Sequence, residues 1–150
     1  MRKALSLLVL TLLGCRAAPE PPPPYKPVAD VKLLMQAVVD PAADVVWGAV
    51  GTIDSKDGIQ EIFPKDDAEW AVVRNNAVVL TESGNLLMMG TRPKDDGDWM
   101  RYCQDLIDVG ARAVKAAEAK DKDAVFEVGG EIYAVCSACH EKYQVKVVEP

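Results

Sequence analysis

Hydrophobic positions recur along most of this chain at steps of three and four residues. The pattern is clearest in residues 65–90, 96–120 and 122–143, and residues 29–51 carry an interrupted version of it. Such steps place apolar side chains on one face of an α-helix, so four helices are predicted. Their apolar stripes are Val31, Met35, Val38, Ala42, Val45 and Ala49; Trp70, Val73, Ala77, Leu80, Gly84 and Leu87; Trp99, Cys103, Leu106, Gly110, Ala113 and Ala117; and Val125, Val128, Ile132, Val135 and Cys139.

The spacing of these segments predicts an all-α fold. Helices joined by short connections pack antiparallel at shallow angles, so we expect an antiparallel four-helix bundle over residues 29–150. The first segment is interrupted by Asp40 and Pro41, which suit a helix start, and it is predicted either as two helices or as one kinked helix. Residues 51–63 contain a turn signal at positions 56–58 but are expected to be too short to build a sheet.

The N-terminus has the pattern of an export signal. Arg2 and Lys3 precede an apolar run over residues 4–13, which is too short to span a bilayer core of roughly 30 Å. The run ends in Leu-Leu-Gly-Cys, which resembles a bacterial lipobox whose cysteine is acylated. We therefore predict a lipoprotein signal peptide at residues 1–14 and lipidation of Cys15. The alternative is an ordinary signal peptide that leaves Cys15 as a free thiol.

Residues 15–28 are predicted to connect the lipid to the bundle. Four consecutive prolines at positions 21–24 favour an extended polyproline II conformation. This segment is interpreted as a tether behind Cys15. The predicted location is the bacterial periplasm, anchored to a membrane through the lipid, with the outer membrane favoured.

Composition narrows the classes of partner. A chain of 150 residues can bury one core, so one domain is expected. Its net charge of −6 and its lack of a basic patch argue against nucleic acid as a partner. The acidity is compatible with attraction to a basic protein, although it also serves simply to keep the domain in solution.

The stretch CSACHEKY, residues 136–143, carries the candidate chemistry. Cys136 and Cys139 stand directly before His140, the only histidine of the chain. A dithiol redox pair, half of a zinc site and covalent haem attachment all use such a pattern. A zinc site of four cysteine and histidine ligands would need a second pair, and the sequence has none. A redox dithiol is expected at the start of a helix, whereas this pair lies near the end of one.

Haem attachment satisfies these constraints. Two cysteines three residues apart on a helix can both form thioether bonds to one edge of a porphyrin, and His140 can then ligate the iron. The export signal directs the chain to the compartment in which such haem is attached. We therefore predict one covalent haem c held by Cys136, Cys139 and His140. Tyr133 shares a helical face with Cys136 and His140 and is expected to border the haem.

A predicted bundle with Cys-x-x-Cys-His on its last helix resembles the class II c-type cytochromes, the cytochrome c-prime family, over about residues 29–143. The resemblance implies a haem inside the bundle whose other face lies toward the first helix. High-spin members leave the sixth iron position empty, and low-spin members fill it with a methionine of the first helix. Met35 matches that methionine, although methionine on an apolar stripe also serves as core filler. Gln144 stands where many members carry an arginine, which weakens a gas-binding role that depends on a cation.

The leading functional prediction is single-electron transfer to or from a periplasmic or membrane redox protein. No general base, nucleophile or substrate pocket is indicated, so no catalytic residue is assigned and the chain is not expected to be an enzyme. The alternatives are a five-coordinate haem protein that binds NO or CO and a haem-free structural lipoprotein. Whether the chain forms a homodimer is left open. Cys103 is expected to be a buried thiol or to form an intermolecular disulfide, and three aromatic side chains are expected to anchor the core: Trp47, Trp70 and Trp99.

Overall fold

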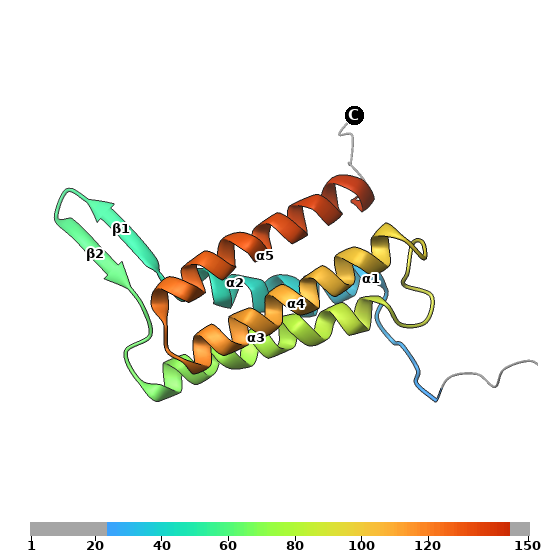
Figure 1. The fold of residues 1–150 in the computed structure, drawn as a ribbon, viewed down its shortest axis with the longest axis horizontal. Coiled ribbons are helices and arrows are strands. Elements are labelled where there is room, and N and C mark those ends of the chain that lie inside the picture. The colour runs from blue at the N-terminus through green and yellow to red at the C-terminus, as the bar shows by residue number, and fades with distance from the viewer. Residues whose placement is uncertain (1–23, 145–150) are drawn as a thin grey trace, which may run out of the picture.

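The computed structural model describes residues 24–144 and is mostly helical (Figure 1). The helices are α1 (Val31–Leu34), the π-helical segment η1 (Met35–Val39), α2 (Asp40–Gly48), α3 (Asp67–Leu87), α4 (Asp98–Glu118) and α5 (Lys122–Tyr143). The prediction of a predominantly helical fold is confirmed. The predicted signal peptide, Cys15 and most of the tether lie outside the described residues. Within residues 24–144, no helix is both long enough and apolar enough to cross a membrane.

Aspartate side chains cap the N-terminal ends of the three long helices. Asp66 precedes α3, and its carboxylate accepts a hydrogen bond of 2.9 Å from the backbone N–H of Glu69. Asp121 caps α5 in the same way. Asp95 serves α4 from a position outside the helix, by accepting a 3.0 Å bond from the N–H of Trp99. Each carboxylate satisfies an N–H group that the first turn of a helix would otherwise leave unpaired.

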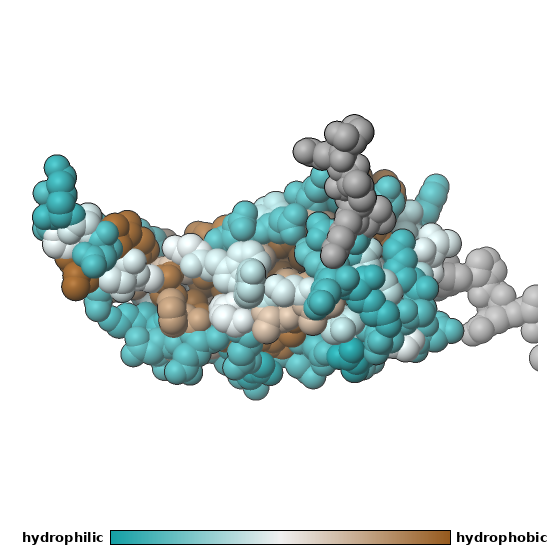
Figure 2. All heavy atoms as spheres, turned by 90° about the horizontal axis from the view of Figure 1, so that it is seen from above, coloured by the Kyte–Doolittle hydropathy of each residue, from teal (hydrophilic) through white to brown (hydrophobic). Residues whose placement is uncertain are grey.

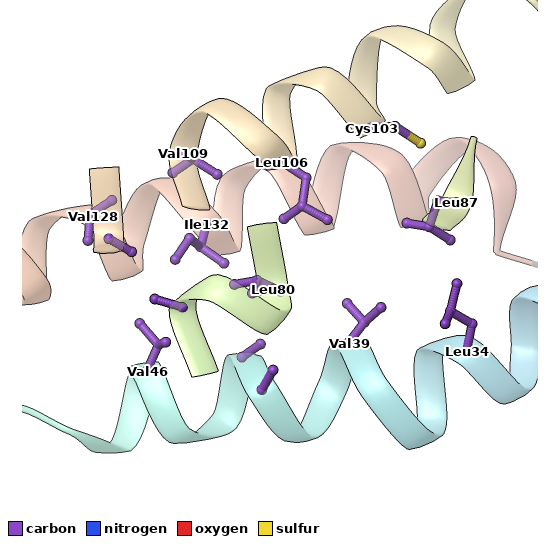
Figure 3. Packing of buried hydrophobic residues seen from close by; sticks show 14 of the residues in the cluster. Leu34, Val39, Val46, Leu80, Leu87, Cys103, Leu106, Val109, Val128 and Ile132 are labelled. Atoms are coloured by element: carbon purple, nitrogen blue, oxygen red, sulfur yellow. The ribbon is translucent and has the colours of Figure 1, made fainter. Parts of the chain in front are cut away.

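The core lies between α3, α4, α5 and the N-terminal helices. α3 and α4 pack along one another, α5 packs on α4, and α2 contacts both α3 and α5. The predicted stripes of α3 and α4 are buried throughout. Figure 3 shows Leu80 of α3 and Ile132 of α5 pointing into the same interior as Val46 of α2. Side chains from four parts of the chain therefore close one apolar core, which continues into a smaller cluster around Trp70.

The first helix departs from its predicted stripe. α1, η1 and α2 follow one another without a break, and we call residues 31–48 together the first helix. Its buried side chains include Leu34 and Val39, whereas Met35 and Val38 are only partly buried. Of the predicted stripe only Ala42 is fully buried and the other members are partly buried. The prediction assumed α-helical steps, whereas the π-helical segment sets the fully buried Leu34 and Val39 five residues apart. The predicted interruption near Pro41 is this π-helical segment, within an otherwise continuous helix.

The connection after the first helix folds into a hairpin, so the prediction that it is too short to build a sheet is wrong. β1 (Gly51–Ser55) pairs antiparallel with β2 (Gly58–Ile62), and Ile53 lies opposite Gln60. Gly58 has a φ of +116°, which only glycine adopts without strain in this tight turn. The hairpin extends away from the helices (Figure 1), and Figure 2 shows hydrophobic side chains on it. Ile59 is 75% exposed.

Arg92 fixes the start of the first helix to the end of α3. Its side chain is buried, and two of its nitrogens donate to the carbonyl oxygen of Ala29 at 3.0 and 2.9 Å. A third nitrogen donates to the carbonyl oxygen of Leu86 at 2.7 Å. The carbonyl of Leu86 lies in the last turn of α3, where it also accepts a 3.3 Å hydrogen bond from the backbone N–H of Met89. The guanidinium group therefore determines where the first helix enters the fold.

Candidate cofactor site

A cavity of about 250 Å³ lies between the first helix, α4 and the C-terminal half of α5. Its wall includes all of the predicted site residues within the described part of the chain: Met35, Tyr133, Cys136, Cys139 and His140. Most of the remaining wall is apolar. It is contributed by Val39, Ala43, Leu87, Trp99 and Leu106, among others. Residues that are about a hundred positions apart in the sequence are thus brought to one space.

α5 presents the motif from its last two turns. Cys136, Cys139 and His140 follow one another at steps of three and one, so they lie on neighbouring faces of the helix. All three side chains are partly buried. The thiols and the imidazole therefore line the cavity from one helix.

The end of α5 is anchored to the loop that precedes α4. The hydroxyl of Tyr143 donates a hydrogen bond to the carboxylate of Asp95. The ring of Tyr143 packs edge-on against that of Trp99, with the two ring centroids 5.2 Å apart. Lys142 pairs with Asp98 at 2.5 Å. The hydrogen bond from Tyr143 lowers the pKa of Asp95, and the hydrogen bond from Lys142 lowers the pKa of Asp98. These contacts hold the motif against α4.

The thiols are in the wrong environment for a redox dithiol. Burial raises the pKa of Cys136 to about 11, with smaller contributions from Cys139 and from Asp40, and burial also raises the pKa of Cys139. Redox cysteines act as thiolates and need a lowered pKa, which the N-terminus of a helix provides. Here both thiols lie near the C-terminal end of α5, where the helix dipole disfavours negative charge. The geometry therefore agrees with the argument made from the sequence against this alternative.

Cys103 brings a third thiol to the cavity, which sequence reasoning missed. It is 3% exposed, so the prediction of a buried thiol is confirmed, and an intermolecular disulfide would require it to leave the core. With Cys136, Cys139 and His140 it would complete a four-ligand zinc set. Among residues 24–144, however, no three histidine, cysteine, aspartate or glutamate side chains are arranged to hold a metal ion. The cavity is not a preformed zinc site.

Met35 reaches the cavity from the first helix, where it is the first residue of η1. It is partly buried and packs against the core. Met88 and Met100 also pack against the core but do not line the cavity. Among the methionines of residues 24–144, Met35 is therefore the one that shares this cavity with the motif of α5.

Trp47 lies at the rim of the cavity, so its prediction as a core anchor is wrong. Its side chain is 37% exposed, whereas Trp70 and Trp99 are buried as predicted. The indole N–H donates to the carbonyl oxygen of Gly129 at 2.9 Å, and its ring lies 6.2 Å from that of Tyr133. Tyr133 is 65% exposed. Two large aromatic rings thus stand partly in solvent at one edge of the cavity.

No family model, curated protein or solved structure matches the chain. The interpretation of the cavity therefore depends on the geometry and chemistry of its own residues.

Proposed function

We propose that this chain is a class II c-type cytochrome, of the cytochrome c-prime kind, that carries single electrons. In this proposal its helices form an antiparallel four-helix bundle around one haem c, which is bonded to Cys136 and Cys139 with His140 as an iron ligand. The observation that carries the proposal is the convergence of this motif with Met35, from a different helix, on one mainly apolar cavity.

The donor set and the walls of the cavity fit a covalently attached haem. Two thiols and an imidazole come from α5, a thioether comes from the first helix, and apolar side chains line most of the cavity between them. Haem supplies a one-electron iron couple whose potential depends on its axial ligands and on burial. A thioether from Met35 favours the reduced iron and raises that potential relative to a harder ligand. The apolar walls keep water away from the ligands, and the rim at Trp47 leaves one edge open to solvent.

The proposed setting is the periplasm. A lipid on Cys15 and the tether over residues 15–28 would hold the domain at a membrane, with the outer membrane favoured, where it exchanges electrons with a redox partner protein. Removal of residues 1–14 would accompany this anchoring. Replacing Cys15 by serine should abolish incorporation of labelled fatty acid into the protein without changing its absorption spectrum, and unchanged incorporation in the variant would contradict the anchor.

Mass spectrometry of the mature chain tests the haem directly. The full chain is produced in a bacterium that attaches c-type haem, and the purified protein should carry the mass of one haem. Replacing both Cys136 and Cys139 by alanine removes both thioether bonds, so acidified acetone should extract pigment that the wild-type chain retains. Cys103→Ala is the matched control, since Cys103 lines the same cavity outside the motif, and it should retain the pigment. A mature wild-type chain without added cofactor mass would overturn the proposal.

Spectra of the same protein test the sixth ligand. Met35→Ala should convert a low-spin spectrum to a high-spin one that shifts with CO, because the variant removes the thioether from the cavity. Met100→Ala is the control, since Met100 packs on the core without lining the cavity, and it should stay low-spin. A high-spin, CO-sensitive wild-type protein would instead support the alternative of a haem protein that binds NO or CO.

A further inference from the structure

The first helix contains a wide turn directly before a proline. In η1, the backbone N–H of Asp40 donates to the carbonyl oxygen of Met35, five residues earlier. The next residue, Pro41, has no N–H group, so it cannot donate to the carbonyl of Ala37 as an α-helix requires, and its ring would clash with that carbonyl. Gln36 and Ala37 are exposed, so the wide turn bulges toward solvent, where water can satisfy its carbonyls.

The wide turn changes which side chains face the cavity. Met35, Val39, Ala43 and Trp47 all line it, at steps of four residues. In an α-helix each such step over-rotates a full turn by about 40°, so three steps would separate Met35 from Trp47 by about 120° around the axis. A π-helical turn closes on the fifth residue, so its step of four falls short of a full turn instead. The step from Met35 to Val39 therefore counteracts the drift.

The buried side of the helix shows the same change of phase. Leu34 and Val39 are both buried although they are five residues apart. The bonds from Arg92 to Ala29 fix the helix on the N-terminal side of the wide turn. Val46 in the core fixes it on the other side. A helix held at both ends has to take up the extra residue between them, and η1 is where it does so.

From these observations we propose that Pro41 is a positioning residue: by preventing an α-helical turn it maintains η1 and so directs Met35 into the cavity. The inference deepens the proposed function, because it takes Met35 to be the sixth iron ligand. Pro41 itself is exposed and does not line the cavity. Its effect on the ligand is exerted only through the backbone of the first helix.

Two variants separate helix phase from general damage. Pro41→Ala restores an N–H group and allows an α-helical turn, so the haem-loaded protein should lose low-spin absorption and gain CO binding. The second variant combines Pro41→Ala with deletion of Ala37. Met35 then stands three residues before Val39, which in an α-helix falls about 60° short of a full turn, on the same side as the π-helical turn places it. This variant should recover the low-spin spectrum. Pro93→Ala, in the loop before α4 and away from the cavity, should change nothing.

Hydrogen exchange supplies a readout that does not depend on haem. Peptides covering residues 36–42 should gain protection in Pro41→Ala, because an uninterrupted α-helical turn opens less readily than one that lacks the hydrogen bond from residue 41 to the carbonyl of Ala37. Unchanged spectra and exchange in Pro41→Ala would overturn the inference, and so would a high-spin spectrum that the deletion does not rescue. A wild-type chain without haem would defeat the proposed function instead, and the exchange experiment would still decide whether Pro41 maintains η1.

Discussion

Substitution of Gly84 tests the contact on which one wall of the cavity depends. A Cβ atom at this position of α3 would lie 2.6 Å from a side-chain carbon of Ile107 and 2.7 Å from the backbone carbonyl oxygen of Cys103. The side chain of Ile107 can rotate away, but the carbonyl cannot move without the rest of α4. Gly84→Ala should therefore push α4 outward at Cys103, which lines the cavity.

The expected magnitude comes from two opposing effects. Alanine is favoured over glycine inside a helix by about 1 kcal/mol. Overpacking a close contact costs about 1–3 kcal/mol, so Gly84→Ala should change the free energy of unfolding by between about zero and a loss of 2 kcal/mol. Gly130 is the matched control, because it is also helical but a Cβ there would meet nothing within 4 Å. Gly130→Ala should gain the full helical preference of about 1 kcal/mol.

Urea unfolding of the two variants, followed by far-UV circular dichroism, measures the difference. The variants should differ by about 1–3 kcal/mol, which at a slope of about 2 kcal/mol per molar corresponds to midpoints about 0.5–1.5 M apart. Both are compared with the same cofactor content, so any stabilisation by a bound cofactor cancels. If Gly84→Ala proves as stable as Gly130→Ala, then α3 and α4 do not approach one another at Gly84 closely enough to exclude a methyl group.

Three further outcomes follow from the ionisable groups. Tyr143→Phe should raise the pKa of Asp95 toward its ordinary value of 3.8, as followed by NMR titration of the carboxyl; a pKa equal to that in the wild type would contradict the hydrogen bond. Because Asp95 and Asp98 both have lowered pKa values when folded, their contribution to stability is present above pH 3.8 and is lost as the pH falls through the folded values. Thermal unfolding between pH 5 and pH 2 should show this loss, and a transition insensitive to pH there would refute it. In protein without haem, alkylation of Cys136 should be slow at neutral pH, because a pKa of about 11 in place of 9.0 leaves about a hundredfold less thiolate. Mass spectrometry follows the alkylation, and modification at the rate of a free thiol would exclude such burial.

The long helices were predictable because the signals that define them are local. Periodic apolar positions and a preceding aspartate, such as Asp66 before α3, act within a few residues of the helix they specify. The π-helical segment was not predictable from the same pattern. A change in hydrogen-bond register leaves only one trace in the sequence, a five-residue step from Leu34 to Val39 shortly before Pro41. A search restricted to three- and four-residue steps cannot find it.

The hairpin and part of the cavity were missed for other reasons. The strands are exposed along nearly their whole length, so burial imposes no alternation on them, and only the turn at Gly58 could have indicated their pairing. The motif around His140 is contiguous and was found from the sequence. Cys103 and Asp40 join it only through the packing of helices, which no local pattern encodes.

The grip of Arg92 on Ala29 has a mechanical consequence if Cys15 is lipidated as proposed. A domain tethered to a membrane experiences force where the tether enters the fold. Here the buried guanidinium of Arg92 bonds Ala29, at that entry point, to Leu86 at the end of α3. These hydrogen bonds lie on the N-terminal side of Met35, so they resist the force before it reaches that residue. Thermal motion of the tether would then leave Met35, the proposed iron ligand, undisturbed, as an electron carrier tethered to a membrane would require.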